Sequence, residues 1–333
     1  MKHFKTYPSM QKRSISESFL NNLKAGLFKS IVDIVRIDPS LDLEMRGDTV
    51  MVYYRGGKTL TIHDPDLYPN MKEAGFLTGL DPKYSYEEKS KQAIPLPHSS
   101  SILDYFAESK HIIDNYEWKV KEHLGEKEIQ QRIVSENNSM VNADETDFFI
   151  ADMEWAENSV LEGRADLIAF HWGHMEHRRK KLTMYLIEVK QGCDAIRTRE
   201  STKKEKVSPG LKKHQQDFYK LQNEKSLIKE LKDDMLEVLR QKYCLGLVKG
   251  LDHLFSQVDG KVTTTGISIE DEIHFVFLLA NYLHYSDNLK NELEDMPDDS
   301  YFFVSSFLGY GLFKDLVLTK AELKKHYPMM FKI

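Results

Sequence analysis

The first third of the chain changes from a helical to an alternating pattern of apolar positions. Leu20 and Leu23 fit a helix over residues 14–29, and Ser14 with Glu17 has the spacing of a capping box. Short apolar, β-branched runs separated by turn residues follow and predict strands. These runs cover residues 30–37, 41–47, 48–57 and 58–64. We therefore expect a small N-terminal domain made of a helix and a β-meander.

The remainder of the chain alternates between helical and strand-like patterns. Residues 66–100 are rich in Pro, Lys, Tyr and Ser and are the best candidate for an irregular connector. Helices are expected over residues 101–125, 126–138, 211–224 and 287–296, with more helix from 224 to about 243, and strands over 147–155, 163–172, 182–192, 272–282 and 301–313. This order is typical of an α/β domain. We expect residues 1–100 to form an accessory α+β domain and residues 101–333 to form the α/β domain.

Composition narrows the class of protein without choosing a function. The 333 residues are 41% hydrophobic and 29% charged, which suits a globular protein. Two cysteines, Cys193 and Cys244, argue against a disulfide scaffold and favour the reducing cytoplasm. The first ten residues lack the apolar core of a signal peptide, and we expect no membrane partner. The net charge of −6 is unusual for a nucleic-acid binder but allows a local basic face.

Charged side chains interrupt two of the expected buried strands. Asp166 lies in one strand, and Glu188 and Lys190 lie two residues apart, on one face, in the next. The short polar segment between the strands predicts a hairpin that brings Asp166 beside Glu188. Two converging carboxylates form a hard oxygen site suited to Mg²⁺, and an adjacent lysine can orient a water or balance phosphate charge.

The structural alternative is an ion pair at the strand ends that joins Lys190 to Asp166 or Glu188. The tripeptide Glu-x-Lys by itself is weak, because the chain contains it six times. The copies begin at Glu87, Glu108, Glu117, Glu188, Glu230 and Glu322. Only the copy at Glu188 lies in a β-rich apolar run with an acid in the neighbouring run.

Asp166 followed by Glu188-Val189-Lys190 resembles the D-x(n)-(D/E)-x-K core of the PD-(D/E)xK nuclease superfamily. The stretch GRADLI is similar to the G-R-x-D-L strand of RecB-like and NucS-like members, with Ala165 in place of the proline of the family name. The resemblance covers roughly residues 115–280. It implies a restriction-endonuclease-like core, in which helices flank a mixed central sheet.

The resemblance also implies a role for each residue of the motif. Asp166 and Glu188 would bind Mg²⁺ or Mn²⁺, and the carbonyl oxygen of Val189 would be a backbone ligand. Lys190 would assist the attacking water. The implied reaction is hydrolysis of a phosphodiester bond.

Two neighbouring helices carry further candidates. RecB-like members have a Gln-x-x-x-Tyr pattern after the core, which Gln215 and Tyr219 match on one helix face. Packing of that helix into the core is the alternative. Members also often carry a glutamate on the preceding helix, and Glu126 falls on its inward face whereas Glu128 does not. A solvated acid at the helix N-terminus is the alternative reading of Glu126.

A basic segment separates the motif from the helix that carries Gln215. It contains Arg197, Arg199 and Lys212, which we assign to nucleic-acid binding because they lie between the two parts of the site. A solvated loop is the alternative interpretation.

Together these features predict a magnesium- or manganese-dependent nuclease that acts on DNA, with roles in restriction, repair or phage defence implied by the resemblance. The alternative is a catalytically silent nucleic-acid-binding or scaffold protein that retained the fold. A hydrolase for another phosphoester is a third reading. A homodimer is one assembly the resemblance implies, because cutting both strands of a duplex needs two sites.

Overall fold

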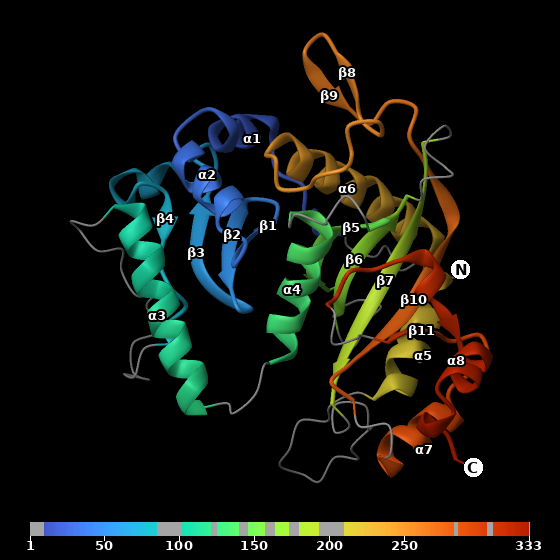
Figure 1. The fold of residues 1–333 in the computed structure, drawn as a ribbon. Coiled ribbons are helices and arrows are strands. Elements are labelled where there is room, and N and C mark those ends of the chain that lie inside the picture. The colour runs from blue at the N-terminus through green and yellow to red at the C-terminus, as the bar shows by residue number, and fades with distance from the viewer. Residues whose placement is uncertain are drawn as a thin grey trace, which may run out of the picture.

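The computed structural model contains two main sheets (Figure 1). It describes residues 10–84, 101–120, 125–139, 146–156, 164–172, 180–192, 210–282, 286–304 and 309–332. Within these ranges, none of the helices is long and apolar enough to cross a membrane.

The N-terminal part consists of two helices and a four-stranded antiparallel sheet. The helices are α1 Glu17–Lys24 and α2 Lys29–Ile37. The strands, in sheet order, are β1 Leu41–Met45, β2 Thr49–Tyr54, β3 Gly57–His63 and β4 Leu77–Thr78, and the 3-10 helices η1 Pro69–Ala74 and η2 Pro82–Tyr84 flank β4. The three strands expected between residues 41 and 64 are confirmed, and β4 adds an edge from the expected connector.

The prediction of a strand over residues 30–37 is wrong, because this run forms α2. Ile31, Val32 and Val35 are buried, and their spacing suits one side of a helix as well as it suits a β-rich run. The expected capping box at Ser14 is also wrong. Ser16 caps α1 by accepting a hydrogen bond from the Phe19 amide.

Helix α3 Ile102–Val120 packs against the N-terminal sheet. The Tyr105 hydroxyl donates to the carbonyl of Thr59 in β3 at 2.6 Å. Ile113 is buried in a small cluster with Leu80 and Tyr84. The division of the chain near residue 100 stays a prediction, and α3 belongs by contact to the first sheet.

The second sheet has six strands in the order β12-β11-β10-β7-β6-β5. Its strands are β5 Phe148–Trp155, β6 Ala165–His171, β7 Lys181–Gln191, β10 Ser268–Ala280, β11 Tyr301–Val304 and β12 Leu318–Thr319. β5, β6 and β7 pair antiparallel, whereas β7, β10 and β11 pair parallel, so the sheet is mixed. The antiparallel pairing of β6 with β7 confirms the expected hairpin.

Helices cover both faces of this sheet. The remaining helices and strands are α4 Glu126–Asn138, α5 Leu211–Gln222, α6 Lys225–Cys244, α7 Asp287–Asp295, α8 Lys320–His326, the 3-10 helices η5 Lys314–Leu316 and η6 Pro328–Met330, and the hairpin β8 Ser256–Val258 with β9 Lys261–Thr263. On one face, Ile129 and Ile133 of α4 pack with Leu167 and Ile187. On the other face, α5 and α6 pack against alternate residues of the same strands. The mixed α/β architecture is confirmed.

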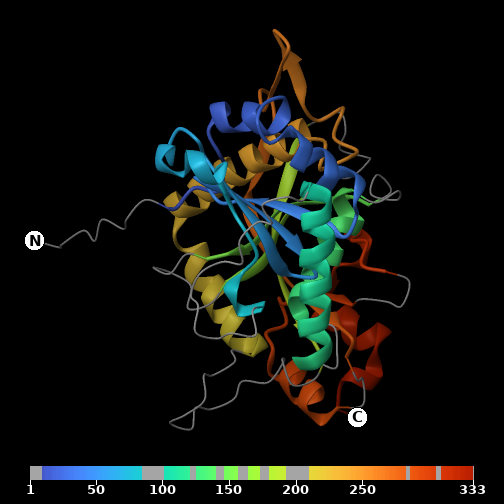
Figure 2. The same cartoon turned by 90° about the vertical axis from the view of Figure 1, so that its left-hand side faces the viewer.

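Helix α4 lies between the two sheets (Figure 1). Figure 2 shows the same arrangement from the side of the N-terminal part, which lies in front of the second sheet. Buried ion pairs also join the N-terminal sheet to the second part. Lys242 of α6 donates to Glu44 of β1 at 2.7 Å, and Arg46 pairs with Asp152 of β5. One hydrophobic cluster contains residues of α1, β1, α6 and β5, so the two parts share a continuous core.

Candidate functional site

The hairpin of β6 and β7 brings Asp166 and Glu188 together, as the sequence predicted. Regular pairing includes Leu167 opposite Ile187, which places Asp166 at the start of β6 and Glu188 toward the end of β7. The Asp166 carboxylate accepts a hydrogen bond from the Val189 amide at 2.7 Å. Both carboxylates are buried, and the Glu188 side chain is only 3% exposed.

Two basic groups contact Glu188. Lys190 Nζ lies 2.7 Å from Glu188 Oε1, so the ion pair expected by the structural alternative is present. His214 Nε2 of α5 lies 3.0 Å from the same oxygen and 3.3 Å from Lys190 Nζ. Sequence reasoning missed His214, because its distance along the chain gives no indication of this contact.

Burial controls the protonation of these carboxyl groups. It raises the pKa of Glu188 to about 7, although the charge of Lys190 opposes this shift. Burial, with the nearby charges of Glu188 and Glu126, also raises the pKa of Asp166 well above its usual range. Burial by itself lowers the pKa of Lys190, but the neighbouring carboxylates outweigh it and the net shift is upward. Lys190 therefore compensates the charge of these carboxylates only in part.

Glu126 joins this group from the first turn of α4. The Gln191 backbone donates a hydrogen bond to its carboxylate, and the charge of Lys190 acts on it. Burial nevertheless raises the pKa of Glu126. Glu128 lies on another side of the helix, where it pairs with Arg55 and Arg132. The structure thus brings Glu126, and not Glu128, to the other carboxylates.

Gln215 and Tyr219 share one face of α5, with their side chains hydrogen-bonded to each other. The Tyr219 hydroxyl donates to Asp299 at 2.9 Å. Gln215 is buried beside His214, and its Oε1 has no hydrogen-bond partner among the described residues. A role of this pair in nucleic-acid binding stays a prediction.

The basic candidates divide between described and undescribed segments. Lys212 is exposed in the first turn of α5, close in sequence to His214. Arg197 and Arg199 lie outside the described residues. Lys127 and Arg164, which sequence reasoning did not single out, are exposed next to Glu126 and Asp166 in the chain, and both pair with Glu154.

The residues provide suitable donor chemistry for a divalent cation. Asp166, Glu188 and Glu126 supply hard oxygen atoms, which Mg²⁺ and Mn²⁺ prefer. Glu188 Oε2 is buried and has no hydrogen-bond partner in the described part of the chain. A cavity of about 20 Å³ beside Glu188 and His214 has room for one water molecule. Across the described ranges, however, no three His, Cys, Asp or Glu side chains already form a metal-binding cluster.

Comparison with known proteins adds no relative. No family model, curated protein or solved structure matches the chain.

Proposed function

We propose that this protein is a metal-dependent nuclease of the PD-(D/E)xK type that hydrolyses phosphodiester bonds in DNA. The observation that carries the proposal is the meeting of Asp166, Glu188 and Lys190 at one end of the β6–β7 hairpin, with Glu126 arriving from α4. The mixed sheet with helices on both faces is compatible with a restriction-endonuclease-like core.

In this proposal, Asp166, Glu188 and the carbonyl oxygen of Val189 would hold Mg²⁺ or Mn²⁺, which when bound would supply an acidic water and polarise the phosphate. Lys190 would orient the attacking water and compensate charge on the phosphate oxygens, as its position beside Glu188 supports. His214 contacts the same Glu188 oxygen and fixes the orientation of the carboxylate.

A nucleic acid is the proposed substrate because exposed cationic side chains lie on the elements that carry the acidic site, and DNA is the nucleic acid that the resemblance implies. Lys127, Arg164 and Lys212 are exposed at the starts of α4, β6 and α5, the three elements that contribute Glu126, Asp166 and His214. These cations can contact phosphates on both sides of the carboxylates. They offer a local basic face in a protein whose net charge is −6.

A catalytically silent binding or scaffold protein is the second candidate. The Lys190–Glu188 ion pair favours it, because the pair already neutralises one buried carboxylate. The nuclease is favoured by three groups that the ion pair with Lys190 leaves uncompensated. These are Glu188 Oε2, which has no hydrogen-bond partner among the described residues, and the nearby carboxyl groups of Asp166 and Glu126.

Cleavage assays separate the two candidates. Labelled single- and double-stranded DNA and RNA are incubated with Mg²⁺, Mn²⁺ or EDTA. We expect DNA cleavage only with metal, and a loss on the order of 100-fold or more in Glu188→Ala and Lys190→Ala. Glu108→Gln is the matched control, because Glu108 begins another Glu-x-Lys and is exposed on α3. Folded wild-type protein that binds DNA without cutting it under any of these conditions is the outcome expected of the silent binder.

A further inference from the structure

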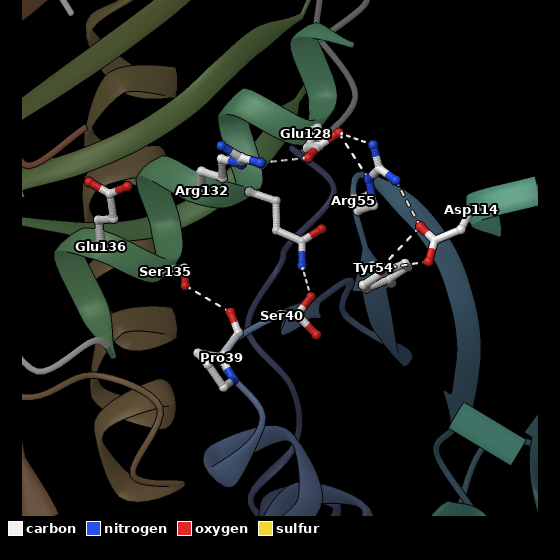
Figure 3. Close-up of a pocket in the computed structure, with 10 residues that line it drawn as sticks. Pro39, Ser40, Tyr54, Arg55, Asp114, Glu128, Arg132, Ser135 and Glu136 are labelled. Carbon is white, nitrogen blue, oxygen red and sulfur yellow. Dashed lines mark hydrogen bonds and ion pairs between the residues drawn. The ribbon is translucent and has the colours of Figure 1, made fainter. Parts of the chain in front are cut away.

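A second cavity lies on the other side of α4 from the candidate site. Its volume is about 620 Å³, within the range of small-molecule sites. Its walls come from α4, from the β2–β3 turn, from α3 and from the segment after α2 (Figure 3). The cavity therefore brings together both parts of the chain and the helix that carries Glu126.

Two arginines supply hydrogen-bond donors to this cavity. Arg55 bridges its walls, with Nη1 2.8 Å from Asp114 of α3 and Nη2 3.0 Å from Glu128 of α4. Arg132 Nη2 contacts the other oxygen of Glu128 at 3.0 Å (Figure 3). Each guanidinium has five N–H donors. Arg132, whose side chain is 49% exposed, therefore retains donors for a ligand.

Flat surfaces accompany these polar groups. Tyr54 lines the cavity, and its hydroxyl donates to Asp114 at 3.1 Å, which holds the ring in place. Lys110 Nζ lies over one face of this ring, 5.3 Å from its centroid, so a ligand would stack on the other face. The planar guanidinium of Arg55 lies in the same wall (Figure 3). Aromatic rings and guanidinium planes are the surfaces on which nucleobases stack in proteins.

The charge of the lining disfavours a phosphate. Asp114, Glu128 and Glu136 carry three negative charges, against two positive charges on Arg55 and Arg132. A polyanion would meet a lining with a net negative charge, whereas an uncharged planar ligand would meet both donors and acceptors. Ring N–H and amino groups can donate to the carboxylates, and ring nitrogen or carbonyl groups can accept from Arg132.

We propose that this cavity binds a nucleobase. The base belongs either to a free nucleoside or to a nucleotide that flanks the cleaved bond. The preference for a nucleobase over other planar polar ligands rests on the proposed function, whereas the cavity and its chemistry do not. Glu126 and Arg132 lie on one helix about 10 Å in diameter, so a strand that enters the site can reach the cavity around α4.

Binding of nucleosides to the full-length protein tests the first source. Adenosine, guanosine, cytidine and thymidine are titrated separately and followed by ligand-observed NMR. We expect at least one to bind with a Kd below about 1 mM. Arg132→Ala should weaken this binding at least tenfold. Arg36→Ala is the matched control, because Arg36 is also half-exposed and pairs with an acid, Asp33, on its own helix.

Oligonucleotides test the second source. Single-stranded DNA with one abasic position, moved along the strand, is titrated into the full-length Glu188→Gln variant and followed by fluorescence anisotropy. If the base comes from the substrate, one abasic position weakens binding at least tenfold, and Arg132→Ala removes this position dependence.

The proposal is overturned if no nucleoside binds in a way that requires Arg132 and if no base position in the strand contributes to binding through Arg132. Neither assay requires cleavage. Arg132-dependent nucleoside binding by a protein that cuts no DNA would therefore contradict the proposed nuclease and leave the nucleobase site standing.

Discussion

At the scale of single residues, Glu188 is the position where the proposed activity conflicts with stability. It is buried, it contacts Lys190 and His214 through one oxygen, and its other oxygen has no hydrogen-bond partner in the described ranges. Burial raises the pKa of Glu188 to about 7 in the folded protein, whereas the ordinary pKa of a glutamate is about 4.3. Between these two pH values the folded protein keeps a proton on Glu188 that the unfolded chain has lost. Stability from this group therefore falls as the pH rises from about 4.3 through about 7.

Glu188→Gln should remove this loss, because glutamine keeps the shape and cannot ionise. The free energy of unfolding of the variant, minus that of wild type, should therefore rise by about 1 kcal/mol or more from pH 5 to pH 8. Urea unfolding at both pH values measures the gain, with exposed Glu108→Gln as the control. The same change of stability with pH in the variant and in wild type would show that Glu188 does not hold this proton.

Magnesium provides a second prediction, for the neighbouring carboxylate of Asp166. A ligand that binds only the folded state raises its stability. Mg²⁺ at about 5 mM, roughly ten times a Kd on the order of 0.5 mM, should therefore raise the free energy of unfolding by about 1.4 kcal/mol. EDTA should abolish the gain, and so should Asp166→Asn. Thermal unfolding with and without the ion measures it, and an equal gain in wild type and Asp166→Asn would place the ion elsewhere.

At the scale of elements, α4 connects the candidate site to the N-terminal sheet. Its first residue, Glu126, lies with the carboxylates, and Glu128 and Arg132 face the cavity of Figure 3. The β2–β3 turn abuts its first turn, and the Gly56 amide donates to Gln131 at 2.7 Å. The position of Glu126 therefore depends on a turn that lies 70 residues earlier in the chain.

Gly56→Ala tests this contact. Gly56 has φ +72°, and an added Cβ would lie 2.4 Å from Cβ and 2.8 Å from the backbone carbon of Lys127. We expect a loss of about 2–4 kcal/mol from left-handed strain and overpacking together. Gly75→Ala is the control, because Gly75 has φ +63° with nothing described within 4 Å, and should lose only about 1 kcal/mol. Equal losses of free energy of unfolding in the two variants, measured by urea unfolding, would show that the turn does not pack closely against α4.

At the scale of the whole molecule, a shared hydrophobic core joins the two sheets, and buried ion pairs link the two parts of the chain. Lys242 and Glu44 are both almost fully buried, and Arg46 and Asp152 form a second pair beside them. Such pairs give little net stability, but removal of one partner leaves a buried charge. The N-terminal part is therefore an integral part of the structure and not a loosely tethered module.

Lys242→Met should cost about 3–5 kcal/mol in free energy of unfolding, because Glu44 loses its nearest cation. The double variant Glu44→Leu with Lys242→Met should recover most of the loss. Lys324→Met removes a half-exposed lysine paired with Glu294 and should cost less than about 1 kcal/mol. A double variant as unstable as Lys242→Met alone would show that the pair itself does not set this cost.

The sequence alone determined the elements that carry the chemistry. Strands β5, β6 and β7 and helix α4 lie where the periodicity predicted them, because buried faces impose regular spacing of apolar residues. The same rule placed Asp166 and Glu188 in adjacent strands and favoured Glu126 over Glu128. It failed over residues 30–37, where an apolar run fits a strand or one side of a helix and only packing decides.

Tertiary structure alone decided the contacts between distant segments. His214 meets Glu188, Lys242 meets Glu44, and Arg55 joins Asp114 to Glu128, although no local pattern marks any of these pairs. Each contact depends on how helices and sheets pack, and this packing is a property of the whole core. The carboxylate pair of the hairpin is therefore readable from local sequence, whereas its basic partners and the second cavity appear only in the folded chain.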